Sequence, residues 1–172
     1  KIIIERDLSL LEDFNCRYHI SQISSLKSVN IIKQKKDNVN FTTGVSINNL
    51  SLNENDIGEF RTFLKLSSPL REEHDRVSLI EGIKNNLIDV IVSDHVPEDE
   101  ESKRLPFAQA ASGSIGIETL LPLALELYHN NSLPLDKIIK CLTINPARIL
   151  KINKGTLKKL ESLIEKIKLK FE

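Results

Sequence analysis

The sequence predicts an α/β protein in which parallel strands alternate with helices. The first observation is a β-branched run, Val90 to Val92, that breaks off into the polar Ser93-Asp94-His95. This pattern is typical of a strand buried on both faces, with polar side chains at its C-terminal end. The second is that similar runs occur earlier in the chain, each followed by a segment with helical spacing of apolar residues. Strands separated in this way by helices indicate βαβ units and a parallel sheet.

The first half of the chain supplies the earlier strands and their helices. Apolar residues at helical spacing predict an amphipathic helix at the start, and alternation of apolar and polar residues predicts the strands. Ser25 can cap the second helix, because a serine hydroxyl accepts hydrogen bonds from the first helical turn. We therefore expect a helix over 1–14, a strand over 17–24, a helix over 26–36 and a strand over 39–47.

The second half continues the alternation and then becomes helical. We expect a polar loop over 48–58, a helix over 72–85, the strand over 88–92, a long loop over 97–117, and helices over 118–129 and 135–142. Residues 98–102 are interpreted as a solvated charged loop. Pro146 suits the first turn of a closing helix. The spacing of apolar residues in the tail, 157–172, predicts a separate amphipathic helix that either docks on the 1–156 domain or binds a partner.

Composition excludes several functional classes. The chain has 172 residues, 40% of them hydrophobic, so one domain is expected. Its 24 basic side chains balance 24 acidic ones, which gives no global attraction to nucleic acid or an anionic membrane. No apolar run approaches the roughly 20 residues of a membrane span. Cys16 and Cys141 are far apart, which favours a reducing, cytoplasmic setting. The absence of Met indicates a start inside a longer protein.

Asp94 is the candidate reactive group. A carboxylate at the end of a parallel strand, beside a histidine, can bind a divalent metal or move a proton during hydrolysis. The alternative is structural: Asp94 caps the following segment, or pairs with Lys103 or Arg104. The residues alone leave both interpretations open.

Seven motifs in order resemble the C-terminal half of a dihydroorotase, a member of the amidohydrolase superfamily of metal-dependent TIM-barrel hydrolases. The resemblance covers residues 1–156 and implies the C-terminal half of a TIM-type (βα) barrel for them. The motifs are Arg17 to Ser25, Gly44 to Leu50 with Asn55 to Gly58, Pro69 to Arg71, Ser93 to His95, Leu105 to Phe107, Gly116 to Thr119, and Asn145 to Arg148.

The resemblance implies reversible cyclisation of carbamoyl-aspartate to dihydroorotate, a step of pyrimidine biosynthesis, over zinc. Asp94 matches the family's strand-end aspartate, which contacts the metal and shuttles the proton, and His95, which follows it as in the family, is a further candidate metal ligand. The loop at Leu105 to Phe107 matches the family's substrate-side loop. Pro106 and Phe107 are therefore candidates to line the substrate pocket.

The sequence also departs from the family at positions that carry chemistry. Gln22 and Asn48 stand where the family has histidines of the metal site, and glutamine is a poor zinc ligand. Glu98 replaces a second histidine, and Ser67 replaces an asparagine of the substrate pocket, where Ser67 and Asn48 remain candidate substrate contacts. His19 lies three residues before Gln22, a spacing that on a strand puts it on the opposite face. We interpret His19 as a packed residue rather than a metal ligand.

Three functions follow. The first is a dihydroorotase-type enzyme segment that needs an N-terminal barrel half. The second is a non-catalytic subunit, similar to the dihydroorotase-like subunits that lack metal-binding histidines and hold aspartate carbamoyltransferase together. The third is a decayed gene fragment. Because half a barrel exposes two sheet edges, we expect association with a second copy or with another of these partners.

Overall fold

The computed structural model describes residues 1–14 and 16–155. The predicted tail helix and the 157–172 domain therefore lie outside the described residues. The elements are α1 (Ile2–Asp13), β1 (Tyr18–Ile20), α2 (Leu26–Lys35), β2 (Phe41–Ser46), α3 (Ile47–Ser51), η1 (Glu54–Ile57), η2 (Thr62–Leu64), α4 (Glu73–Lys84), β3 (Val90–Val92), α5 (Glu100–Arg104), α6 (Leu120–His129), α7 (Leu135–Leu142) and α8 (Ile144–Ile149). The η elements are 3₁₀ helices.

The three strands form one parallel sheet in the order β1-β2-β3. β1 pairs with the first half of β2, with Tyr18 opposite Phe41, and β3 pairs with the second half, with Gly44 opposite Val90. The predicted α/β class with parallel strands is thus confirmed, and the described sheet is open rather than closed. Because the strands are parallel, their C-terminal ends lie at one edge, where the polar residues that follow them can meet.

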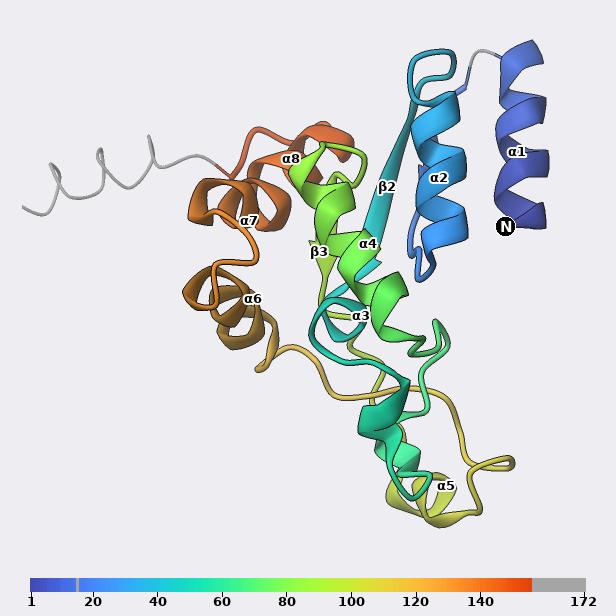
Figure 1. The fold of residues 1–172 in the computed structure, drawn as a ribbon, viewed down its shortest axis with the longest axis vertical. Coiled ribbons are helices and arrows are strands. Elements are labelled where there is room, and N and C mark those ends of the chain that lie inside the picture. Colours follow the sequence, from blue (N-terminus) through green and yellow to red (C-terminus); the bar gives the residue numbers. More distant parts are fainter. Residues whose placement is uncertain (15, 156–172) are drawn as a thin grey trace, which may run out of the picture.

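One face of the sheet carries the hydrophobic core. Phe41 and Val45 point to the same face of β2 and are buried with Ile32 of α2 and with Leu79 and Ile83 of α4 in one cluster. Helices α2 and α4 pack against each other, and Figure 1 shows α1 and α2 on one side of β2 and α6, α7 and α8 on the other. The helical spacing of apolar residues in the sequence therefore marks the faces that cover this sheet.

Two predicted loops contain short helices. The polar segment predicted as a loop over 48–58 forms α3 and η1, and η1 is closed by a capping box between Asn53 and Asp56. The charged segment 98–102 enters α5, whose N-cap Asp99 accepts a hydrogen bond from the Ser102 backbone at 2.8 Å. As loop assignments both predictions were wrong, because side-chain caps stabilise a single turn that apolar periodicity does not mark. The solvation expected for 98–102 is confirmed, since 98–101 are exposed and Ser102 is half-buried.

The strands are also shorter than predicted. The segment predicted as a strand over 17–24 pairs only at Tyr18–Ile20, and the one over 39–47 pairs at Phe41–Ser46. The predicted Ser25 cap is confirmed, since the Ser28 backbone donates to its hydroxyl at 3.2 Å. Pro146 lies in the first turn of α8, as expected.

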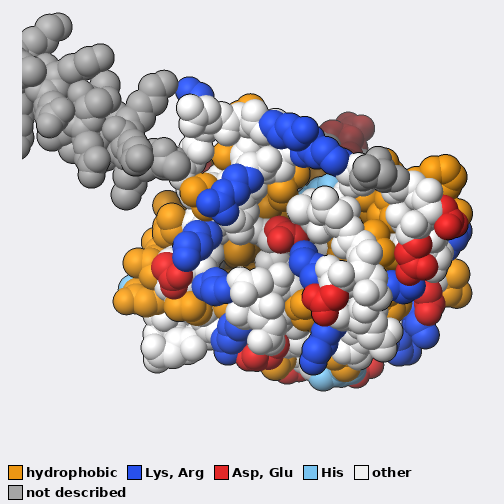
Figure 2. All heavy atoms as spheres, turned by 90° about the horizontal axis from the view of Figure 1, so that it is seen from above, with side chains coloured by type: hydrophobic (Ala, Val, Ile, Leu, Met, Phe, Trp, Pro, Cys, Tyr) orange, Lys and Arg blue, Asp and Glu red, His pale blue; other side chains and the backbone are white. Residues whose placement is uncertain are grey.

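A cavity of about 610 Å³ lies at the N-terminal ends of the strands, with Arg17, His19 and Arg148 among its lining residues. Figure 2 looks onto this end and shows Lys and Arg side chains gathered around a hollow. At the opposite end, the segment with η1, η2 and α5 extends away from the sheet (Figure 1). The candidate site lies between the sheet and this extension, at the C-terminal ends of the strands.

Candidate functional site

Asp94 lies two residues beyond the end of β3 and adopts an uncommon backbone conformation, with φ of 52°. Aspartate tolerates this left-handed region better than most residues, and such conformations concentrate at functional sites. Its carboxylate oxygen Oδ1 accepts a hydrogen bond of 2.6 Å from Nε2 of Gln22. Among the described residues, neither Lys103 nor Arg104 pairs with Asp94: Lys103 bonds to backbone carbonyls, and Arg104 pairs with Glu100.

The Gln22–Asp94 bond joins the C-terminal ends of the two outer strands across β2. The segment after β1 packs closely on β2, and this shortens the distance that the Gln22 side chain must span to reach Asp94. The Ile23 backbone donates to the Gly44 carbonyl at 3.0 Å, and a Cβ at Gly44 would lie 2.4 Å from the Ser21 carbonyl oxygen. Glycine at position 44 therefore permits the approach that brings Gln22 to Asp94.

Asn48 lies two residues after the end of β2, in the first turn of α3, and is only 6% exposed. Its side-chain nitrogen Nδ2 is buried and has no hydrogen-bond partner among residues 1–14 and 16–155. The neighbouring Asn49 donates to the Pro69 carbonyl at 3.1 Å and so ties α3 to the loop that contains Ser67. Because buried polar groups are normally paired, the free donor on Asn48 is a candidate contact for a ligand oxygen.

His95 is held by the backbone that follows the long loop. Its Nδ1 accepts hydrogen bonds from the Gly116 amide at 3.0 Å and the Ile117 amide at 3.4 Å. A neutral imidazole with Nδ1 as acceptor carries its proton on Nε2. Neither ring nitrogen then offers a lone pair to a metal, so the geometry gives His95 a structural role.

His19 lies on β1, where its Nδ1 is 2.7 Å from Oγ1 of Thr42 on the neighbouring strand. Partial burial lowers the pKa of His19, and the charge of Asp89 opposes that shift. Its side chain lines the cavity at the N-terminal ends of the strands and also a second cavity that Gln22 lines, but no hydrogen bond among the described residues links it to Asp94. The structure therefore does not bring His19 to Asp94.

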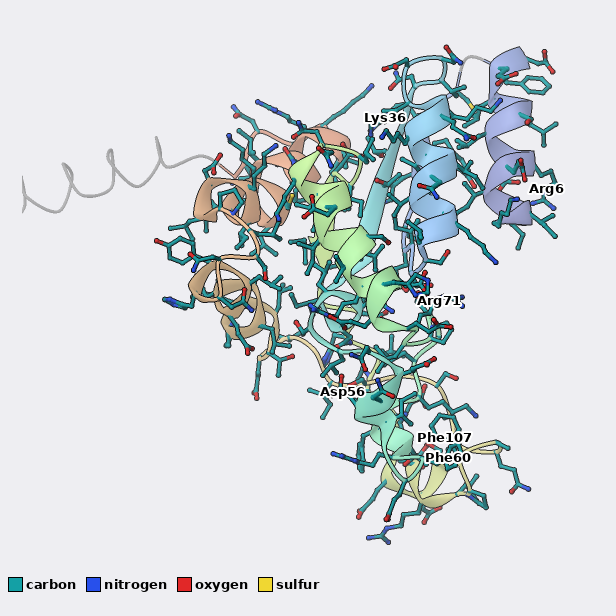
Figure 3. All side chains as sticks on the ribbon, in the orientation of Figure 1. Arg6, Lys36, Asp56, Phe60, Arg71 and Phe107 are labelled. Carbon is teal, nitrogen blue, oxygen red and sulfur yellow. The ribbon has the colours of Figure 1, made fainter. Side chains whose placement is uncertain are left out.

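The predicted substrate-side residues lie in and beside the extension. Phe107 packs edge-on against Phe60, with ring centroids 5.6 Å apart, and Figure 3 shows the two rings together near α5. Pro106 and Ser67 are exposed. No hydrogen bond within the described residues links these three predicted positions to Asp94, and their contact with a substrate stays a prediction.

Arg71 was not singled out as a site residue from the sequence, yet it lies beside the segment that holds Gln22. Its Nε donates to Oγ of Ser24 at 3.0 Å, and it lines a cavity of about 350 Å³ together with Gln22. The only sequence signal was its place at the end of the Pro69-Leu70-Arg71 motif. The guanidinium brings a positive charge to this end of the sheet.

The described side chains do not fit a zinc ion. Zinc sites use imidazole, thiolate or carboxylate ligands, usually four in number. Across residues 1–14 and 16–155, no group of three or more His, Cys, Asp or Glu side chains is placed to hold a metal. At the two positions where the resemblance expects histidines, Gln22 turns an N–H donor toward Asp94 and Asn48 carries an unpaired N–H donor. These N–H groups suit oxygen acceptors and cannot act as metal ligands.

Comparison with known proteins decides the family. The model of the amidohydrolase family matches residues 5–159. The chain belongs to the amidohydrolase family. This amidohydrolase chain is 44% identical over 160 residues to a protein named dihydroorotase from Ehrlichia canis, a match that covers 92% of the chain and 36% of that relative. A dihydroorotase from the Wolbachia of Brugia malayi is 40% identical over the same length.

Solved structures match the fold of this amidohydrolase chain. The L-hydantoinase (dihydropyrimidinase) from Arthrobacter aurescens superposes with a TM-score of 0.85 at 26% identity, over 90% of the chain and 36% of that protein. The chain thus spans about 36% of the length of the relatives it matches. In the part of the chain that the structure describes, no helix has the length and apolar character to cross a membrane.

Proposed function

We propose that this amidohydrolase chain is part of a dihydroorotase-type cyclic amidohydrolase that interconverts carbamoyl-aspartate and dihydroorotate in pyrimidine biosynthesis. The observation that carries the proposal is Asp94 at the C-terminal edge of the parallel sheet, in a chain 44% identical to a dihydroorotase. We further propose that the chain corresponds to the C-terminal half of the barrel and works with a segment that supplies the remaining strands.

The role proposed for Asp94 is proton transfer. Within the described residues Oδ2 has no hydrogen-bond partner, while Oδ1 is held by Gln22. A carboxylate fixed on one side and open on the other can accept the proton that the ureido nitrogen loses as it attacks the substrate carboxyl carbon. That proton and a second one from solvent leave with the departing carboxylate oxygen as water, so the step is balanced.

The substrate contacts proposed are Asn48, Ser67, Pro106 and Phe107. The unpaired Nδ2 of Asn48 would donate to a substrate oxygen, and Phe107 would form an apolar wall. Zinc, which the resemblance implies, is not assigned to this chain because its donor set does not fit the ion. Free Cys16 and Cys141 suit a reducing cytoplasm, which is the location we propose.

Isothermal titration calorimetry with dihydroorotate tests this function. We expect the chain to bind dihydroorotate and Asp94→Asn to weaken binding by roughly tenfold or more, since a hydrogen bond to a charged group contributes about 1.5–3 kcal/mol. Asp136→Asn is the matched control, because Asp136 is exposed on α7 and pairs with Lys140. Equal affinity in the Asp94 and Asp136 variants, or no binding by the unaltered chain, would contradict the proposal.

A non-catalytic subunit is the second candidate. The Gln22–Asp94 hydrogen bond favours it, because the amide satisfies the carboxylate where the family places a metal. A chain of this kind would hold aspartate carbamoyltransferase without acting on substrate. Failure to bind dihydroorotate, together with co-elution with aspartate carbamoyltransferase in size-exclusion chromatography, would support this function over the first.

A further inference from the structure

Lys103 is a buried cation at the junction of the extension. It is only 5% exposed, although it directly follows the segment 98–102, which was expected to be solvated. Its Nζ donates to three backbone carbonyls: Gly113 at 2.5 Å, Ala111 at 2.8 Å and Thr62 at 3.2 Å. An ammonium has three protons, so these bonds use its full capacity. Such pairing offsets the large cost of burying a charge.

Lys65 binds the same loop from the other side. Its Nζ donates to the carbonyls of Ala110 at 2.6 Å, Phe107 at 2.7 Å and Ala108 at 3.0 Å. The ammonium also lies 5.7 Å from the centroid of the Phe107 ring, within the range of a cation–π contact. Lys65 therefore fixes both the backbone and the ring of Phe107.

The two segments also bond through their backbones. The Gly113 amide donates to the Lys65 carbonyl at 2.8 Å, and the Thr62 hydroxyl donates to the Lys103 carbonyl at 2.5 Å. Residues 62–65 and 103–113 thus hold each other reciprocally. The two lysines together supply six side-chain hydrogen bonds to backbone carbonyls.

The fixed loop continues directly into the segment beside Asp94. Ser114, one residue after Gly113, pairs with His95, and the Val96 amide donates to the Ser114 carbonyl at 2.9 Å. A Cβ at Gly113 would lie 2.4 Å from the Val96 carbonyl oxygen, so the two backbones are in close contact. Displacement of Gly113 would therefore act on the segment that follows Asp94.

We propose that Lys65 and Lys103 are positioning residues that form a latch, fixing residues 105–113 as a rigid wall against the Asp94–Val96 segment. The loop is then a preformed part of the site, not a lid that closes on substrate. Lys65 sets the place of Phe107, and Lys103 sets the place of Gly113 and Ser114. The contribution of Phe107 to substrate binding rests on the proposed function, whereas the latch itself does not.

Hydrogen–deuterium exchange of the full chain, followed by mass spectrometry, tests the latch. In the unaltered chain we expect slow exchange in peptides covering 105–113. Lys65→Met and Lys103→Met should accelerate that exchange at least tenfold, while peptides from β2 stay unchanged. Lys65→Arg, which keeps a cation with several donors, should retain slow exchange. Lys84→Met, at an exposed lysine paired with Glu81, is the control and should leave the loop unaffected.

Two results would overturn the latch: unchanged exchange of 105–113 in both methionine variants, or acceleration spread equally over β2 and the loop. A second measurement, the affinity for dihydroorotate, tests whether Lys65 positions Phe107. Lys65→Met should weaken dihydroorotate binding several-fold while its unfolding midpoint stays that of Lys84→Met, and Lys65→Arg should restore the affinity. Unaltered affinity in Lys65→Met would refute the positioning role. If the unaltered chain binds no dihydroorotate but the loop is released as expected, the proposed function fails and the latch stands.

Discussion

At the scale of single residues, the segment beside Asp94 depends on a backbone approach that only glycine allows. A Cβ at Gly116 would lie 2.2 Å from the carbonyl oxygen of Ser93. The Gly116 amide also makes the shorter of the two hydrogen bonds to Nδ1 of His95. A side chain here would push the post-loop segment away from the end of β3.

Gly116→Ala should therefore destabilise the chain by about 1–3 kcal/mol, the usual cost of forcing extra volume into a packed region. Urea denaturation followed by circular dichroism measures the change. Ser114→Ala is a suitable control, since the Ser114 hydroxyl bonds only to the adjacent Ile115 carbonyl, and a change within about 0.5 kcal/mol is expected there. Equal stability of the Gly116 and Ser114 variants would show that the backbone moves without strain.

The sequence predicts some site residues better than their partners. Asp94 and Gln22 were both singled out, but their hydrogen bond joins positions 72 residues apart, and no local pattern encodes such a pair. From the sequence, Lys103 was considered only as a possible ion-pair partner of Asp94. Its burial arises from carbonyls at Thr62, Ala111 and Gly113, which only the folded chain brings together.

At the scale of elements, α7 covers β3 and contains the buried thiol of Cys141. Burial raises the pKa of Cys141 to about 11, and the negative charge of Asp89 acts in the same direction. The neutral thiol is thus favoured in the folded state. Its stabilising contribution is fully present below the usual pKa of 9.0 and is lost as the pH rises through about 11.

Alkylation by iodoacetamide at pH 8 should distinguish the two cysteines, because the thiolate is the reactive form. Exposed Cys16 should react at least tenfold faster than buried Cys141. In urea sufficient to unfold the chain, the two rates should converge. Similar rates in native buffer would show that α7 opens readily and does not cover β3 as described.

The elements that the sequence predicts well are those with an apolar face. α1, α2, α4 and α7 match their predicted ranges within one or two residues, since helical spacing marks the side that packs. α3 and α5 were missed because capping side chains and contacts to distant segments stabilise them. The strands were predicted too long, because apolar alternation continues past the residues that pair.

At the scale of the whole molecule, the described sheet has three parallel strands and two unpaired edges, on β1 and β3. Its relatives are longer, and the chain corresponds to about 36% of their length. Unpaired edges of a parallel sheet tend to find another strand. The proposed function requires further strands beside these edges, next to which the Asp94 edge would act on substrate.

The rate of dihydroorotate formation from carbamoyl-aspartate tests this account most directly. The chain is mixed with the part of the Ehrlichia canis dihydroorotase that the match does not cover, and each part is also assayed alone. We predict formation of dihydroorotate only in the mixture, with a loss of roughly 100-fold or more when the chain carries Asp94→Asn, as expected for a proton-transfer group. An undiminished rate with Asp94→Asn, or no reaction in a mixture whose parts are folded and associated, would contradict it.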